Sequence, residues 1–104
     1  MLRAALVAIC LAVLPAAAFA AGKTNTVTIE GMKFVPERLE VAAGDTVVWT
    51  NKDFLPHTVT ASGAKVESGE LATNKTFRFV AKKKGEMPYI CRLHPVMKGL
   101  LIVK

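Results

Sequence analysis

Thr46-Val47-Val48-Trp49-Thr50 is a run of β-branched and aromatic residues with turn-forming residues on both sides. Such side chains favour an extended strand, and the flanking segments Ala43-Gly44-Asp45 and Asn51-Lys52-Asp53 are typical of turns. The run alternates without a helical period. It therefore predicts a strand between two turns, and the same pattern decides the fold class of the whole chain.

Similar short segments recur on either side of this strand. They alternate polar and apolar residues and are separated by turn residues. The further expected strands are 26–29, 38–41, 57–60, 75–80, 87–91 and 100–103. About seven or eight short strands at this spacing predict an all-β antiparallel sandwich or barrel. Pro88 lies inside one of them and has no amide to donate, so we expect it at an edge, a bulge or a strand start.

The first twenty residues have the layout of a secretory signal peptide. Met1-Leu2-Arg3 is a short positive region, residues 4–14 are apolar, and Ala18-Phe19-Ala20 fits a small-x-small cleavage site. A membrane anchor is the alternative, but a spanning helix needs about 20 apolar residues and Pro15 interrupts this stretch. We expect residues 1–20 to be removed and residues 21–104 to form one exported, periplasmic domain without stable membrane association.

The expected mature domain has a single thiol. Removal of residues 1–20 takes away Cys10 and Arg3, which lowers the formal net charge from +6 to +5 and leaves only Cys91. No intrachain disulfide can then form, although disulfides are the usual role of cysteine in exported proteins. Metal ligation would account for the thiol and would stabilise a small domain. Nucleic-acid binding is not expected, because no basic patch is interleaved with aromatic residues.

Three metal donors follow one another at three-residue spacing in segment 89–99, at Cys91, His94 and Met97. Thiolate and thioether are soft donors and imidazole is intermediate, so this set favours copper over magnesium, calcium or manganese. His57 is the only other histidine and would complete two histidines, one cysteine and a weak axial methionine. Taken singly, a cysteine or a methionine commonly fills a core. Together these residues predict one copper ion, Cu(I)/Cu(II), with Cys91 at a strand end and the donors His94 and Met97 in the following loop.

Nearly all of the expected mature domain resembles the cupredoxin family of blue copper proteins. The resemblance is carried by residues 31–51, by Pro56-His57-Thr58-Val59 and by the spacing of Cys91, His94 and Met97, which is similar to that of amicyanin-type and short plastocyanin-like members. It implies a Greek-key β-sandwich with a type 1 copper site near one end. It also implies a soluble carrier of single electrons.

Three residues are expected to surround and tune this site: Asn51, Thr58 and Leu93. Thr58 stands where relatives often carry asparagine, and its hydroxyl can bridge the two ligand segments. Leu93 stands where relatives carry proline and therefore has a backbone N–H. We predict that this N–H donates to the Cys91 sulfur and raises the reduction potential.

An apolar patch is expected over the metal, with a positive border. Its residues are Leu55, Pro56, Pro95 and Val96, bordered by Arg92 and Lys98. Such a patch suits transient encounters with a redox protein, for example a cytochrome c or a periplasmic oxidoreductase. The border would favour an acidic docking face on the partner. We expect the protein to be a monomer.

Three other functional classes are an enzyme, a copper chaperone or storage protein, and a thiol-based redox sensor. The predicted site has no open strong position, and the sequence contains no Ser/His/Asp set or phosphate loop, so an enzyme is not expected. A copper chaperone or storage protein is the main alternative, although Met-rich and His-rich tracts are missing. A redox-sensing role for the Cys91 thiol would need no metal at all.

Overall fold

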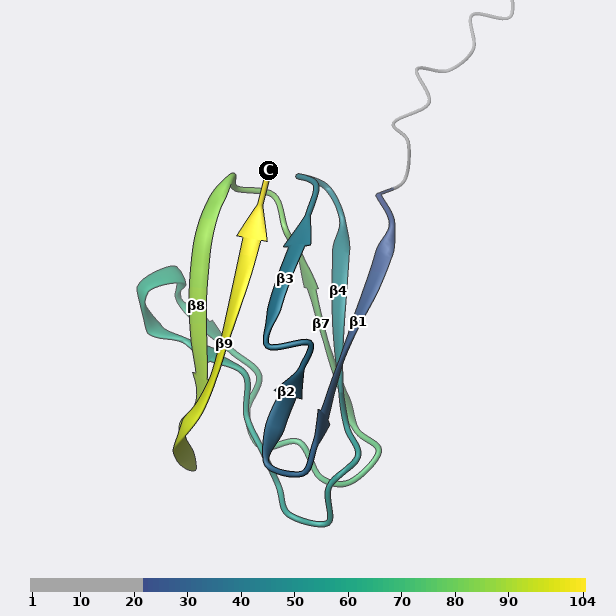
Figure 1. Cartoon of the computed structure of the whole chain (residues 1–104), viewed down its shortest axis with the longest axis vertical. Coiled ribbons are helices and arrows are strands. Elements are labelled where there is room, and N and C mark those ends of the chain that lie inside the picture. The colour runs from purple at the N-terminus through teal and green to yellow at the C-terminus, as the bar shows by residue number, and fades with distance from the viewer. Residues whose placement is uncertain (1–21) are drawn as a thin grey trace, which may run out of the picture.

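The chain forms a sandwich of two β-sheets. The computed structural model describes residues 22–104, so the predicted signal peptide at 1–20 lies outside the described residues. The strands are β1 (Thr24–Glu30), β2 (Lys33–Val35), β3 (Arg38–Val41), β4 (Thr46–Asn51), β5 (Thr60–Ala61), β6 (Val66–Glu67), β7 (Thr76–Val80), β8 (Gly85–Cys91) and β9 (His94–Val103). One sheet has the order β2-β1-β4-β7 and the other the order β3-β9-β8-β5-β6 (Figure 1).

The all-β prediction is confirmed, but the two sheets are mixed and not purely antiparallel. β1 runs parallel to β4, with Val27 opposite Trp49, and β3 runs parallel to β9. Alternation in a sequence reports which face of a strand is buried and carries no information about the direction of its neighbour. The sequence pattern therefore predicted the sandwich without its parallel pairs.

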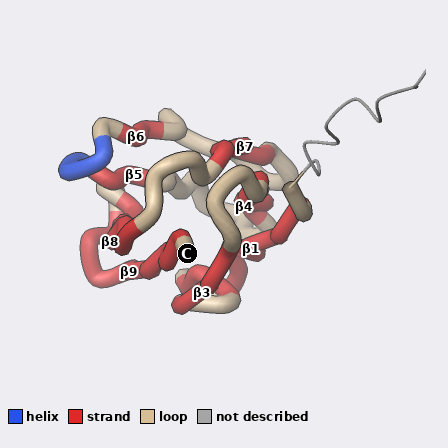
Figure 2. Tube along the Cα trace, turned by 90° about the horizontal axis from the view of Figure 1, so that it is seen from above, coloured by secondary structure: helices blue, strands red, loops and turns tan. Residues whose placement is uncertain are grey.

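Helical structure is confined to a single short turn in the described residues. This turn, η1 (Ser62–Ala64), is a 3₁₀ helix beside β5 and β6, seen at the edge of the molecule in Figure 2. Within residues 22–104, no helix has the length and apolar character needed to cross a bilayer.

Aromatic side chains from both sheets meet in the core. Trp49 on β4 is fully buried and packs edge-on against Tyr89 on β8, with ring centroids 5.4 Å apart. Phe34 on β2 contacts the same tyrosine ring at 4.7 Å. Full burial of a large apolar side chain stabilises a fold by about 1.5–3 kcal/mol. The core thus ties the strand that carries Cys91 to the opposite sheet.

Several segment boundaries differ from the sequence prediction. The expected strand 57–60 is reduced to an isolated bridge between His57 and Leu71, followed by β5. Strands β2 and β6 were not predicted, because segments of two or three residues carry too few alternations to detect.

Pro88 lies within β8 without costing a ladder hydrogen bond. It is opposite Leu100 of β9, whose N–H donates to the Glu37 carbonyl at 2.8 Å and so faces away from β8. In an antiparallel pair, two opposed residues either both direct their backbone N–H groups toward each other or both direct them away from each other. At Pro88, the position where an N–H would be therefore points away from β9. On that side β5 pairs with β8 only at Ile90. The prediction of an edge, a bulge or a strand start for Pro88 is therefore wrong, because Pro88 lies in the middle of an inner strand and is accommodated where β5 leaves β8 unpaired.

The β8–β9 hairpin contains a bulge that sets the positions of the predicted ligands. Ile90 pairs with Lys98, whereas the next residue, Cys91, pairs with His94, so residues 95–97 are extra on β9. The expectation that His94 and Met97 lie in a loop is wrong, because both belong to β9 and the turn itself is only residues 92–93. A bulge interrupts the hydrogen-bond ladder locally and redirects side chains. No characteristic residue pattern marks it in the sequence.

Candidate metal centre

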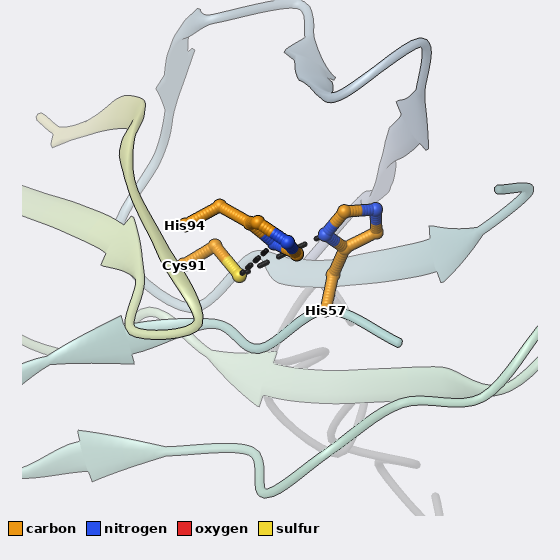
Figure 3. A group of neighbouring side chains, drawn as sticks. All are labelled: His57, Cys91 and His94. Carbon is orange, nitrogen blue, oxygen red and sulfur yellow. Dashed lines mark hydrogen bonds between the residues drawn. The ribbon is translucent and has the colours of Figure 1, made fainter. Parts of the chain in front are cut away.

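Three predicted donors converge at one end of the sandwich (Figure 3). Cys91 ends β8, His94 begins β9, and His57 lies in the connection between β4 and β5. The Cys91 Sγ atom is 3.7 Å from Nδ1 of His57 and 3.7 Å from Nδ1 of His94. The donor atoms of the three residues all lie within 4.8 Å of one another. Cys91 and His57 are fully buried and His94 is half-buried.

The distances and the chemistry of this donor set fit a single copper ion. A small divalent ion bound at about 2.0–2.3 Å by nitrogen and sulfur separates neighbouring donors by roughly 3.5–4 Å, and the observed sulfur–nitrogen distances fall in that range. Two imidazoles with one thiolate in a trigonal arrangement form the strong donor set of blue copper sites. The residues present therefore fit the cofactor predicted from sequence.

Met97 belongs to the bulged segment that follows His94 on β9. It is the last of the three extra residues on β9 and is 3 % exposed, within the buried apolar cluster. Its role as a weak fourth ligand remains a prediction.

Thr58 joins the two segments that carry the donors. Its backbone N–H donates to the Cys91 Sγ at 3.3 Å, and its hydroxyl accepts the Arg92 N–H at 2.9 Å. These two hydrogen bonds hold the segment after His57 against the end of β8. The Thr58 hydroxyl thus bridges the two segments.

Leu93 does not donate to the sulfur in the described structure, and the predicted hydrogen bond is replaced by the one from Thr58. The physical reason lies in the turn. Cys91 pairs directly with His94, so Arg92 and Leu93 form a two-residue hairpin turn with Leu93 at the surface. The sequence shows that residue 93 has a backbone N–H, but it does not show in which direction that N–H points.

Asn51 stabilises the loop that carries His57. The side chain is fully buried, and its Nδ2 donates to the carbonyls of Leu55 at 2.9 Å and Leu71 at 2.8 Å, while its Oδ1 accepts the Asp53 N–H at 2.9 Å. Leu71 in turn exchanges two backbone hydrogen bonds with His57. Asn51 therefore holds the loop through these hydrogen bonds and makes none to the sulfur.

Asp53 was assigned only to a turn from sequence, yet it contacts the buried His57 directly. Its Oδ2 is 2.8 Å from Nε2 of His57, and its carboxylate accepts the N–H groups of Gly31 at 2.7 Å and Met32 at 3.0 Å. Burial opposes ionisation and is the largest single influence on the Asp53 pKa, but the Met32 and Gly31 amides and the His57 ring together hold it below its usual range. A carboxylate on the outer nitrogen commonly orients a ligand histidine. In the sequence, the only indication of this contact is an acidic residue four positions before His57.

The residues of the expected apolar patch are at the surface near the donors. Val96 is 88 % exposed and Leu55 is 52 % exposed, and Pro56 and Pro95 are also exposed. Phe54, which the sequence interpretation left out, is 97 % exposed beside Leu55. A phenylalanine so open to solvent extends the apolar area on the loop that carries His57.

The two cations of the expected positive border differ in their surroundings. The Arg92 Nε donates to Glu67 Oε1 at 2.7 Å, and this contact raises the Arg92 pKa. Lys98 is exposed. The positive charge of Arg92 is therefore partly compensated, which the sequence did not indicate because Glu67 is 25 residues away.

Comparison with known proteins gives the family. The Cupredoxin-like domain family matches residues 3–103. The chain is 38% identical over 89 residues to amicyanin-alpha of Methylorubrum extorquens, covering 81% of this chain and 74% of that protein. Its fold superposes on the Cu(I) form of a methionine-to-alanine variant of amicyanin with a TM-score of 0.75 and 27% identity, covering 78% of this chain and 82% of the other.

A larger copper protein contains a similar fold. The Cu-containing nitrite reductase from Thermus scotoductus superposes with a TM-score of 0.73 and 29% identity, over 78% of this chain and 22% of that chain. The similarity thus concerns about a fifth of that protein. Sheet order, donor geometry and these similarities agree that the chain belongs to the cupredoxin-like family, with amicyanins among its relatives.

Proposed function

We propose that this protein is a periplasmic blue copper protein that carries single electrons between redox partners. Its strong ligands would be His57, Cys91 and His94, with Met97 as the weak axial ligand. The observation that supports this most directly is the Cys91 sulfur 3.7 Å from two imidazole nitrogens. Copper supplies a reversible one-electron change between Cu(I) and Cu(II) when it is bound.

The chain's own contribution is to hold the donors in nearly fixed positions. The Asp53 carboxylate holds the outer nitrogen of His57, and Thr58 holds the sulfur of Cys91. Donors that are already anchored rearrange little when the charge of the site changes. A small rearrangement lowers the barrier to electron transfer, and a rigid set of two imidazoles, one thiolate and one weak thioether would suit neither oxidation state of copper fully.

His94 is the proposed exit for the electron. Its ring is half-buried, and the exposed Pro95 and Val96 follow it directly in the chain. A partner that covers these two residues would come close to the ring without displacing a ligand. We infer that the partner combines an apolar centre with an acidic rim, because the patch is apolar and Lys98 borders it.

A carrier is favoured over an enzyme by the composition of the site. Two histidines, a cysteine and a methionine would leave no strong position open for a substrate or water, which catalytic metal sites require. The nitrite reductase similarity covers 22% of that chain and therefore does not transfer its reaction to this domain.

The first test is to express residues 1–104, with the predicted signal peptide included, and to purify the protein from the periplasmic fraction. After copper(II) addition, we expect an intense blue thiolate-to-copper band that ascorbate bleaches and ferricyanide restores. The Cys91→Ala variant is the control and should stay colourless. Sequencing of the amino-terminus should give Ala21 as the first residue.

Two results would overturn the proposal. A protein that binds copper without a blue band or without reversible redox would favour the chaperone or storage function. A protein that binds no copper but oxidises reversibly at Cys91 would favour the thiol sensor.

A further inference from the structure

We propose that Glu67 is a positioning residue of the copper site, which acts through a closed ring of hydrogen bonds on the two segments that carry Cys91 and His57. The inference rests on the proposed function, because the ring would tune the bound metal. The side chains of Glu67 and Thr60 make no hydrogen bond to a donor residue in the described structure, and the sequence patterns indicate a role for neither.

The ring, which we call the Glu67 ring, has four members from four places in the chain. Arg92 donates its backbone N–H to the Thr58 hydroxyl at 2.9 Å and its Nε–H to Glu67 Oε1 at 2.7 Å. The Thr58 and Thr60 hydroxyls are 2.8 Å apart, and the Thr60 hydroxyl donates to Glu67 Oε2. The circuit therefore links the turn after β8 with the connection before β5, with β5 itself and with β6.

The carboxylate of Glu67 fixes the direction of the two hydrogen bonds in this ring that hydroxyl groups donate. An ionised carboxylate can only accept, so the Thr60 hydroxyl must donate to it. The Thr60 oxygen is then free to accept the proton of the Thr58 hydroxyl. Thr58 therefore keeps its lone pairs for the Arg92 N–H. With an amide at position 67, a donor could face Thr60 and reverse the hydroxyl protons.

The ring bears on the metal through Thr58. The same residue that accepts the Arg92 N–H donates its own N–H to the Cys91 Sγ. A hydrogen bond to a copper-bound thiolate draws electron density from the sulfur and raises the reduction potential. If the ring opens, Thr58 moves away from Arg92, its bond to the sulfur weakens and the potential falls.

A merely superficial ion pair would not have this effect. The Arg92 and Glu67 side chains are 45% and 42% exposed, and exposed pairs contribute little by themselves. Hydrogen bonds in a connected chain, in contrast, polarise one another. The Glu67 carboxylate is also held by the Gly69 N–H at 3.3 Å, so it is anchored independently of Arg92.

The sharpest test removes one hydroxyl without changing charge. Thr60→Val is nearly isosteric and breaks the ring, and Thr28→Val on β1 is the matched control, since both threonines are half-buried strand residues. We expect the midpoint potential of Thr60→Val, measured by protein voltammetry, to shift below that of wild type. The potential of Thr28→Val should not change.

A second pair of variants separates the ring from simple charge. Glu67→Gln and Glu70→Gln each remove one negative charge near Arg92, since Glu70 acts on the guanidinium only through its charge. We expect the potential of Glu67→Gln to lie below that of Glu70→Gln. Equal potentials for these two variants, together with an unchanged Thr60→Val, would overturn the proposal.

Amide hydrogen exchange tests the ring independently of the metal. In metal-free protein, Thr60→Val should speed exchange at Arg92 and Thr58, by about fivefold to tenfold for the loss of one net hydrogen bond. Unchanged exchange at both amides would overturn the ring. A wild-type protein without a blue site would overturn the proposed function instead, and exchange in the metal-free form would still decide on the ring.

Discussion

The outer nitrogen of the buried His57 lies 2.8 Å from a carboxylate oxygen of Asp53, and that carboxylate is itself anchored by two amides of the turn between β1 and β2. The turn between β1 and β2 therefore fixes the Asp53 carboxylate, which in turn holds the Nε2 side of the His57 ring. This contact leaves Nδ1 of His57 directed toward the Cys91 sulfur.

Replacement of Asp53 by asparagine should weaken the metal site. We expect copper affinity to fall by about 10- to 100-fold, the usual cost of losing the residue that orients a ligand histidine. The reduction potential should rise, because a neutral partner makes the imidazole a poorer donor to Cu(II). Competition with a calibrated chelator measures the affinity. Asp45→Asn, at the other end of the sandwich, should bind as wild type does, and equal affinity of the two variants would contradict the role.

Gly99 should not tolerate a side chain. A Cβ at this position would overlap Cζ of Tyr89, which is its cross-strand neighbour and part of the aromatic core. Overpacking of this kind costs about 1–3 kcal/mol, so Gly99→Ala should lower the free energy of unfolding by that amount in urea titrations. Gly63→Ala is the control, because open space surrounds the position. Similar losses in both variants would contradict this assignment.

Asp45 should make stability depend on pH in the acid range. Its carboxylate accepts the N–H groups of Ala42 and Lys23, each at 2.9 Å, and these contacts, led by Ala42, hold its pKa below the usual range. A pKa that is lower in the folded state stabilises the protein above the unfolded value of about 4, and this stabilisation is lost as the pH falls further.

The measurement is the free energy of unfolding of the metal-free protein between about pH 6 and pH 2, because without the metal no ligand titration is coupled to copper release. Asp45→Asn should show a shallower decline than wild type. Identical slopes in the two proteins would mean that Asp45 is not responsible.

Lys98 should steer anionic reaction partners to the patch. At low ionic strength, Lys98→Glu should slow oxidation by ferricyanide, a small anionic probe, and the difference should shrink as salt is added. Lys82→Glu carries the same change of charge on the turn between β7 and β8 and should have a smaller effect. If both variants slow the reaction equally, only net charge matters and the border has no local role.

The sequence predicted those features that depend on residue type and short periodicity. Trp49, with alternating neighbours, predicted a buried strand, and the donor types and spacing of Cys91, His94 and Met97 predicted a metal site. These inferences work because burial and coordination chemistry select residue types directly.

The sequence did not predict the orientation of backbone N–H groups or the contacts between residues that are far apart in the chain. The Leu93 amide was identified, but its orientation follows from a hairpin register that residue types do not encode. Asp53 and Glu67 matter through contacts with particular partners, and the Glu67 partner Arg92 is 25 positions away. Such pairs become visible only when the strand order is known.

The two ends of the described chain lie together, away from the donor cluster. The backbone carbonyl of Lys104 accepts the Ala43 N–H, and that of Lys23 accepts the Thr46 N–H. β8 runs from Gly85 at that end of the sandwich to Cys91 at the other (Figure 1). β8 has seven residues, and the six steps between them, at about 3.3 Å each, span roughly 20 Å. A protein tethered to an electrode through Lys104 would present His94 to the solution and exchange electrons slowly with the metal surface. A tether at Val96 would reverse this behaviour.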